Sequence, residues 1–179
     1  MNVQNILLVD DREENLIALE TILEEPGRKL TRASSGNDAL MILLKEEVAL
    51  VILDVQMPEM TGYEVAEIMR SNKKTKNIPI IFATANHTDP SNVFQGYRCG
   101  AVDYLFKPLE PTALQGKVNV FLELDRQKKL LQRTLVQLKR LKDQNDRLLV
   151  AIGEGVVSVN LSGELTFINP VAEELLAED

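Results

Sequence analysis

The feature that most constrains the fold of this chain is a set of short apolar runs without polar interruptions. Three of them read ILLV at residues 6–9, LVIL at 50–53 and IIFA at 80–83. A strand with one face in water alternates apolar and polar residues, whereas an uninterrupted apolar run is typical of a strand covered on both faces. Such runs favour a parallel sheet whose crossover connections are helices packed on its two sides.

Amphipathic stretches between these runs predict the helices. Residues 13–24 place Leu16, Leu19 and Leu23 at positions i, i+3 and i+7, which puts them on one helix face. Further helices are predicted over residues 36–47, 63–71 and 91–98. The residues expected to face inward from the first of these three are Ala39, Leu40, Leu43 and Leu44.

The same reading gives five strands, which alternate with the helical stretches along the chain. They are predicted over residues 5–10, 29–34, 50–54, 78–85 and 101–108. Regular alternation of strand and helix indicates parallel βαβ units. The predicted fold class is therefore α/β, with a doubly wound, five-stranded parallel sheet.

Polar side chains stand at the carboxyl ends of four of these strands. They are Asp10 and Asp11 after the first strand, Asp54 after the third, Thr84 after the fourth and Lys107 after the fifth. Because the carboxyl ends of parallel strands meet at one edge of the sheet, we expect these side chains to converge in a crevice there. Clustered carboxylates repel each other, and Mg²⁺ suits them because it is hard, takes oxygen ligands and keeps several waters.

This set of side chains suits an aspartate that attacks phosphorus. The chain contains no Gly-x-x-x-x-Gly-Lys segment, which excludes a Walker-type nucleotide pocket. Aspartate nucleophiles form acyl phosphates, and Mg²⁺ together with a lysine neutralises the oxygens of the transferring group. Thr84 could donate a hydrogen bond to the phosphoryl group once it is attached.

Five short motifs follow one another along the strand ends. They are Asp10-Asp11 after ILLV, Asp54 followed by Met57-Pro58 and Gly62, Thr84-Ala85, Gly100-Ala101 through Asp103-Tyr104, and Lys107-Pro108. In this order and spacing the chain resembles the receiver domain of bacterial two-component response regulators, over roughly residues 4–120. The resemblance implies a flavodoxin-like sheet with strand order 2-1-3-4-5.

The resemblance also implies a role for each residue of the crevice. Asp54 would accept a phosphoryl group from a histidine kinase or a phosphotransfer protein. Asp11, Asp54 and the backbone carbonyl of Gln56 would bind Mg²⁺, and Asp10 would act on the metal through water. Lys107 would pair with the phosphoryl group.

Two further features follow from the same resemblance. Thr84 and Tyr104 would form the switch, in which the hydroxyl moves to the phosphate and the ring turns inward behind it. The Lys107–Pro108 peptide would be cis. Gln56 and Asn86 occupy the positions that tune loss of the phosphoryl group in the family, and neither is an acid or a base here.

A long helix is predicted after the fifth strand. Residues 112–152 contain no proline and only one glycine, Gly116. Leu124 is followed by a seam of residues at steps of three and four: Leu131, Leu135, Leu138, Leu141, Asn145, Leu148 and Ile152. This spacing predicts a coiled coil, hence a homodimer, in which Asn145 would fix the register of two strands. The alternative is a solvated helix folded back on its own domain.

The tail has a different pattern. GVVSVNL and LTFIN alternate around the turn Ser162-Gly163-Glu164, which predicts a hairpin, and PVAEELLAE predicts a helix. This order resembles the opening of a PAS sensory domain; the alternative is an unrelated hairpin docked on the coil or a partner. The predicted organisation is a receiver over 1–120, a helical linker over 112–152 and a PAS-like fragment over 153–179.

Composition narrows the compartment and the partners. The net charge is −7, which argues against nonspecific nucleic-acid binding. Residues 116–152 carry 4 acids and 9 bases, but the leucine spacing assigns this segment to the coil instead. The single cysteine, Cys99, fits a reducing cytoplasm, and no apolar run is long enough for a membrane helix.

Two other functions compete with the receiver. A haloacid-dehalogenase-like phosphatase shares the aspartate, threonine, lysine and Mg²⁺, but it needs a second aspartate two residues after the nucleophile, where this chain has Gln56. A dimerisation scaffold that is never phosphorylated is the third possibility. By family resemblance, a PAS segment after a receiver often precedes a cyclic-dinucleotide enzyme or a histidine kinase, and the residues present do not choose between these or another output.

Overall fold

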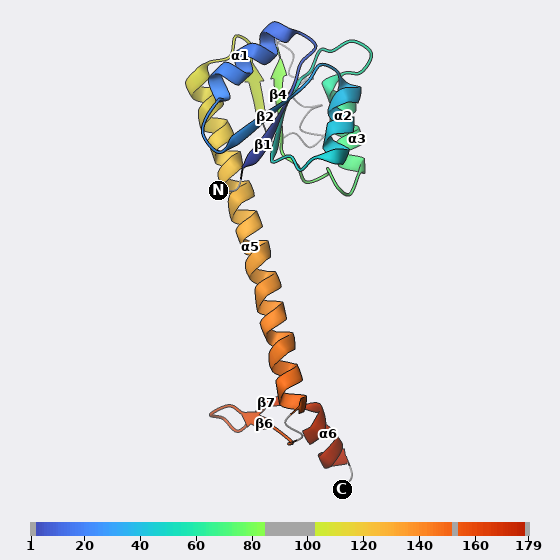
Figure 1. Ribbon diagram of the computed structural model, residues 1–179, viewed down its shortest axis with the longest axis vertical. Coiled ribbons are helices and arrows are strands. Elements are labelled where there is room, and N and C mark those ends of the chain that lie inside the picture. The colour runs from blue at the N-terminus through green and yellow to red at the C-terminus, as the bar shows by residue number, and fades with distance from the viewer. Residues whose placement is uncertain (1–2, 85–102, 152–153, 178–179) are drawn as a thin grey trace. The chain divides into compact units, whose positions relative to one another are not determined.

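The computed structural model describes residues 3–84, 103–151 and 154–177, and it divides the chain into the units Met1–Arg126 and Gln127–Asp179. The first unit contains a five-stranded parallel sheet in the order β2-β1-β3-β4-β5, which confirms the predicted topology (Figure 1). Its strands are β1 Gln4–Val9, β2 Arg28–Ala33, β3 Leu50–Asp54, β4 Ile80–Thr84 and β5 Asp103–Phe106.

Helices cover both faces of this sheet. They are α1 Glu13–Leu23, α2 Gly36–Lys45, α3 Gly62–Ser71 and α5 Pro111–Ala151. Figure 1 shows α2 and α3 on one face, with α1 and the first turns of α5 on the other. The helix predicted over 91–98 lies outside the described residues, as do Asn86 and Cys99.

The strands bury both of their faces, as their apolar runs predicted. In β1, Leu7 and Val9 belong to the core under α2 and α3, whereas Ile6 and Leu8 belong to the core under α1 and α5. All four are at most 1% exposed. A one-residue shift in the pairing of this strand would move each of these side chains to the opposite face of the sheet. Because all four are apolar, both faces would stay apolar. The polar residues at the strand ends are therefore what distinguishes the observed register.

The inward face predicted for α2 was too wide. Gly36, Ala39 and Leu43 are buried, but Leu44 is 55% exposed. The buried positions follow i, i+3 and i+7, which makes a narrow stripe, and Leu44 lies about 100° beyond Leu43 around the helix. Leu40 is half-buried at the border of the stripe.

The long helix was predicted over 112–152 and is observed as α5, Pro111–Ala151. Its first turns dock on the sheet through Leu114, Val118 and Leu122, which are at most 4% exposed. The Nε2 of Gln4 at the start of β1 donates to the Leu122 carbonyl at 2.7 Å and to Asp125 at 2.9 Å. Polar contacts therefore fix α5 at the amino-terminal edge of the sheet.

In the second unit, the strands β6 Val157–Val159 and β7 Leu165–Ile168 pair antiparallel, and α6 Pro170–Ala177 follows. The hairpin loop is closed by Asn160, whose Oδ1 accepts hydrogen bonds from the amides of Ser162 and Glu164. Gly163 takes φ +80°, a conformation that favours glycine. Within the described residues, no helix has an apolar stretch sufficient to cross a membrane.

Candidate functional site

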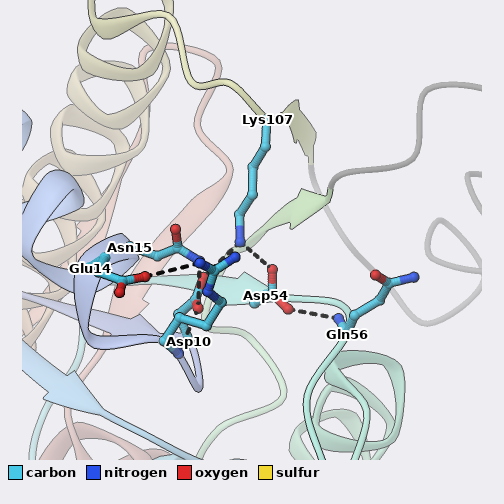
Figure 2. Close-up of polar contacts among 7 residues, drawn as sticks. Asp10, Glu14, Asn15, Asp54, Gln56 and Lys107 are labelled. Carbon is cyan, nitrogen blue, oxygen red and sulfur yellow. Dashed lines mark hydrogen bonds and ion pairs between the residues drawn. The ribbon is translucent and has the colours of Figure 1, made fainter.

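Three of the predicted residues come together at the carboxyl edge of the sheet. The Lys107 Nζ lies 2.7 Å from Asp10 Oδ2 and 2.5 Å from Asp54 Oδ1. Figure 2 shows the two carboxylates pointing toward the lysine from the ends of β1 and β3, which are neighbours in the sheet. Asp10 and Asp54 are 1% and 5% exposed, so two acids are held in a protein environment around one ammonium.

The loop after β3 fixes both the side chain and the backbone around Asp54. Its Oδ2 accepts a hydrogen bond from the Gln56 amide at 2.7 Å. The loop then returns, and the Gly62 amide donates to the Val55 carbonyl at 3.0 Å. A Cβ on Gly62 would overlap the Asp54 carbonyl oxygen and would lie 3.1 Å from Val55 Cα, so this approach requires glycine.

Asp10 is positioned by the start of α1. Its Oδ1 accepts hydrogen bonds from the Arg12 amide at 3.0 Å and from Asn15 Nδ2 at 2.8 Å. Figure 2 shows Asn15 beside Asp10 in this arrangement. Sequence reasoning missed Asn15; the available signal was an amide in the first helical turn, five residues after a strand-end acid.

The electrostatics of the cluster favour a further cation. Burial raises the pKa of Asp54, and the hydrogen bond and charge of Lys107 oppose that rise while the Asp10 charge adds to it. Burial lowers the pKa of Lys107, but its bonds to Asp10 and Asp54 raise it overall. Two carboxylates therefore share one lysine that stays protonated, and the cluster can accommodate additional positive charge.

The donor chemistry fits Mg²⁺. Asp10, Asp54 and the Gln56 carbonyl offer only oxygen atoms as metal ligands. Mg²⁺ prefers oxygen ligands and needs only one or two carboxylates, because it retains several of its waters. Among the described residues, no three His, Cys, Asp or Glu side chains form a group that could hold a metal by themselves. Asp11 is exposed, next to Asp10. The ligand set that the resemblance implies stays a prediction.

Thr84 and Tyr104, the residues predicted to form the switch, lie on the neighbouring strands β4 and β5. Thr84 and Tyr104 are each 7% exposed. The Tyr104 ring packs on Phe82, with centroids 5.3 Å apart, and belongs to the core under α2 and α3. The Lys107 amide donates to the Thr84 carbonyl at 2.8 Å, and the Lys107–Pro108 peptide is cis.

The predicted seam is exposed. Every described side chain from Leu130 to Leu148 is exposed. The apolar members of the seam are each more than half exposed: Leu131, Leu135, Leu138, Leu141 and Leu148. Asn145 is exposed as well, and Ile152 lies outside the described residues.

Comparison with known proteins shows which family the chain matches. The family model described as response regulator receiver domain matches residues 6–119. The chain is similar to a Vibrio cholerae protein named "Probable cyclic di-GMP phosphodiesterase", with 40% identity over 126 residues, 70% of this chain and 28% of that protein. It is also similar to the transcriptional regulatory protein GltR of Pseudomonas aeruginosa, with 37% identity over 68% of this chain and 50% of GltR. The chain thus spans half or less of these two relatives.

Solved structures agree in fold. The Vibrio cholerae chemotaxis protein CheY4 matches with a TM-score of 0.62 and 29% identity, covering 66% of this chain and 98% of CheY4. A CheY-like receiver domain protein from Methanospirillum hungatei matches with a TM-score of 0.64 and 25% identity, covering 70% and 98% of the two chains.

Proposed function

Because the chain belongs to the response regulator receiver domain family, we propose that it accepts a phosphoryl group on Asp54 in a two-component system. The observation that carries the proposal is the buried Asp54 carboxylate, 2.5 Å from Lys107 and beside Asp10. A histidine kinase or a phosphotransfer protein would be the donor.

The proposed transfer moves one phosphoryl group between two side chains. A carboxylate oxygen of Asp54 attacks phosphorus, a P–O bond forms, and the P–N bond to the donor imidazole breaks. The leaving imidazole nitrogen keeps the electron pair of the P–N bond and takes a proton from the solvent. Lys107 stabilises the negative charge on the phosphoryl oxygens, and Thr84 donates a hydrogen bond to the product.

Mg²⁺ would be held by Asp54, Asp11 and the Gln56 carbonyl, with Asp10 acting through water. When bound, it would supply charge neutralisation for the incoming phosphoryl oxygens. The chain's own residues orient the acceptor, since the Gln56 amide and Lys107 hold the two Asp54 oxygens in place.

A small acyl phosphate donor tests this function directly. We expect intact-mass spectrometry to show addition of one phosphoryl group in the presence of Mg²⁺ and none after chelation with EDTA. The adduct should be lost at alkaline pH, as acyl phosphates are hydrolysed. Absence of any adduct, with the protein folded and Mg²⁺ present, would favour a scaffold that is not phosphorylated.

We further propose that the signal passes along α5 through a homodimer, toward a PAS-like module that begins in the tail. The exposed leucines of the seam support this, because an apolar stripe at steps of three and four is typical of a two-stranded coil. A phosphorylated receiver would then favour one of two arrangements of the paired helices.

Light scattering of a matched pair of variants tests the dimer. We expect a dimer mass for the wild type and a monomer mass for Leu138→Glu, because a charge on the seam must be desolvated on pairing. Gln137→Glu introduces the same charge one position away and should remain dimeric. A wild-type monomer that dimerises only with beryllofluoride would make assembly the switch, and a monomer in both states would contradict the proposal.

A further inference from the structure

In the described part of the second unit, one polar side chain has no exposed surface, that of Asn169 between β7 and α6. Its Oδ1 accepts hydrogen bonds from the Val156 amide at 2.8 Å and the Ala172 amide at 2.9 Å. Its Nδ2 donates to the Glu154 carbonyl at 2.9 Å and to the Leu149 carbonyl at 3.3 Å. One amide group therefore joins three segments of the chain.

Two of these bonds complete helix ends. The carbonyls of the last helical turn have no partner within their own helix, and Leu149 is in the last turn of α5, which ends at Ala151. The Nδ2 of Asn169 supplies a donor there. At α6, which begins at Pro170, Asn169 is the N-cap and accepts from the third helical residue, Ala172. The same side chain thus caps the end of α5 and the start of α6.

The segment between the helices is fixed by the same residue. The backbone N–H of Asn169 donates to the Val156 carbonyl at 3.0 Å, and the backbone N–H of Val156 donates to Asn169 Oδ1 at 2.8 Å. The two residues therefore hold each other by a reciprocal pair of hydrogen bonds. Gly155 lies against α6 so closely that a Cβ would be 3.1 Å from Ala172 Cα. Residues 154–156 are therefore held between Asn169 and the first turn of α6.

An open groove lies at this junction. A groove of about 590 Å³ separates the last turns of α5 from β7 and the start of α6. Its lining includes Lys142, Arg147 and Ala151 on α5, and Phe167 and Pro170 opposite. Beside this groove, the bond from Asn169 Nδ2 to the Leu149 carbonyl links the described end of α5 to the residue between β7 and α6.

We propose that Asn169 is a positioning residue that couples the last turn of α5 to the hairpin and α6, so that a displacement of one is passed to the other. The inference rests on the relay proposed above and names the residue through which the relay would leave α5. Only a primary amide offers two donors and an acceptor at this length of side chain, which is why aspartate or serine cannot replace both halves of the contact.

The variant Asn169→Asp separates the hydrogen bonds that the side chain accepts from those that it donates. The variant keeps the acceptors for Val156 and Ala172, and aspartate is a good N-cap, but it loses both donors to Leu149 and Glu154. Hydrogen exchange should become faster by about tenfold or more at the last turn of α5 and at 154–157, because the carbonyls of Leu149 and Glu154 lose their hydrogen-bond donor. Asn169→Ser should behave in the same way at the end of α5.

Asn160→Asp is the matched control. It makes the same change in the same hairpin. The Asn160 side chain accepts two backbone hydrogen bonds and donates one from Nδ2 to Glu164 Oε2 at 2.7 Å, and all three bonds stay within the hairpin loop. We expect exchange at the end of α5 to match the wild type. The inference is overturned if Asn169→Asp or Asn169→Ser increases exchange only in the hairpin and α6, or if Asn160→Asp increases exchange at the end of α5 as much as Asn169→Asp does.

These measurements use the full chain without a phosphodonor. Failure of Asp54 to become phosphorylated would therefore leave the exchange result intact. Conversely, a labelled Asp54 with an uncoupled Asn169 would retain the receiver function and remove this residue from the relay.

Discussion

Asp54→Asn is expected to reduce phosphoryl labelling from a small acyl phosphate to the background level. The amide oxygen is a far weaker nucleophile than a carboxylate, and no other acid in the described cluster has the same access to Lys107 and the Gln56 amide. Intact-mass spectrometry in the presence of Mg²⁺ measures the effect. The fold should survive, because the Asn Oδ1 can still accept a hydrogen bond from Lys107.

Asp143→Asn is the control for this experiment. Asp143 is exposed on α5, and the substitution removes the same charge without touching the cluster, so labelling should equal that of the wild type. Wild-type labelling of Asp54→Asn would show that the acceptor is a different residue. Circular dichroism of both variants separates loss of the acceptor from loss of the fold.

Gly62→Ala should lower both the stability of the fold and the phosphoryl labelling of Asp54. The new Cβ would overlap the Asp54 carbonyl oxygen, so the loop from Val55 to the start of α3 must move. Backbone atoms cannot yield as a flexible side chain can, and overpacking of this kind costs about 1–3 kcal/mol. Urea denaturation should show a lower midpoint with little change in slope. Labelling should fall because the Gln56 amide no longer holds Asp54 in place.

Gly116→Ala makes the same chemical change without a clash. Gly116 lies within α5, a Cβ added to it would meet no described atom within 4 Å outside its own helical turn, and its φ is not in the left-handed region. Alanine is favoured over glycine in a helix by about 0.5–1 kcal/mol, so this variant should be slightly more stable than the wild type. Equal stability of the two glycine variants would show that the loop relaxes freely and that Gly62 is not required for the approach.

Much of the receiver could be predicted because its signals are local. The apolar runs ILLV and LVIL were long enough to identify strands covered on both faces, and strand order followed from the resemblance. Asp54 stood out because a single acid ended an otherwise buried strand. The parallel sheet then brought it to Asp10 and Lys107, residues 44 and 53 positions away along the chain, as shared strand ends require.

The errors and omissions came from contacts that local periodicity does not encode. Leu44 has the spacing of a buried residue in α2, but the width of the buried stripe depends on how the helix sits on the sheet. Asn15 contacts Asp10 only because α1 begins with a particular orientation after β1. Neither the exposure of Leu44 nor the contact between Asn15 and Asp10 can be read from the spacing of apolar residues.

The sequence by itself predicted the strands and helices that the structure describes, and the place of Asp54 at a strand end, because apolar periodicity and the order of short motifs are properties of neighbouring residues. Only the tertiary structure decided which groups touch: that Gln4 holds α5 at Leu122, that Gly62 returns to Asp54, and that Asn169 caps two helices at once. Those contacts depend on the paths of segments distant in the chain, and hydrogen bonds are satisfied by whichever polar group folding brings within about 3 Å.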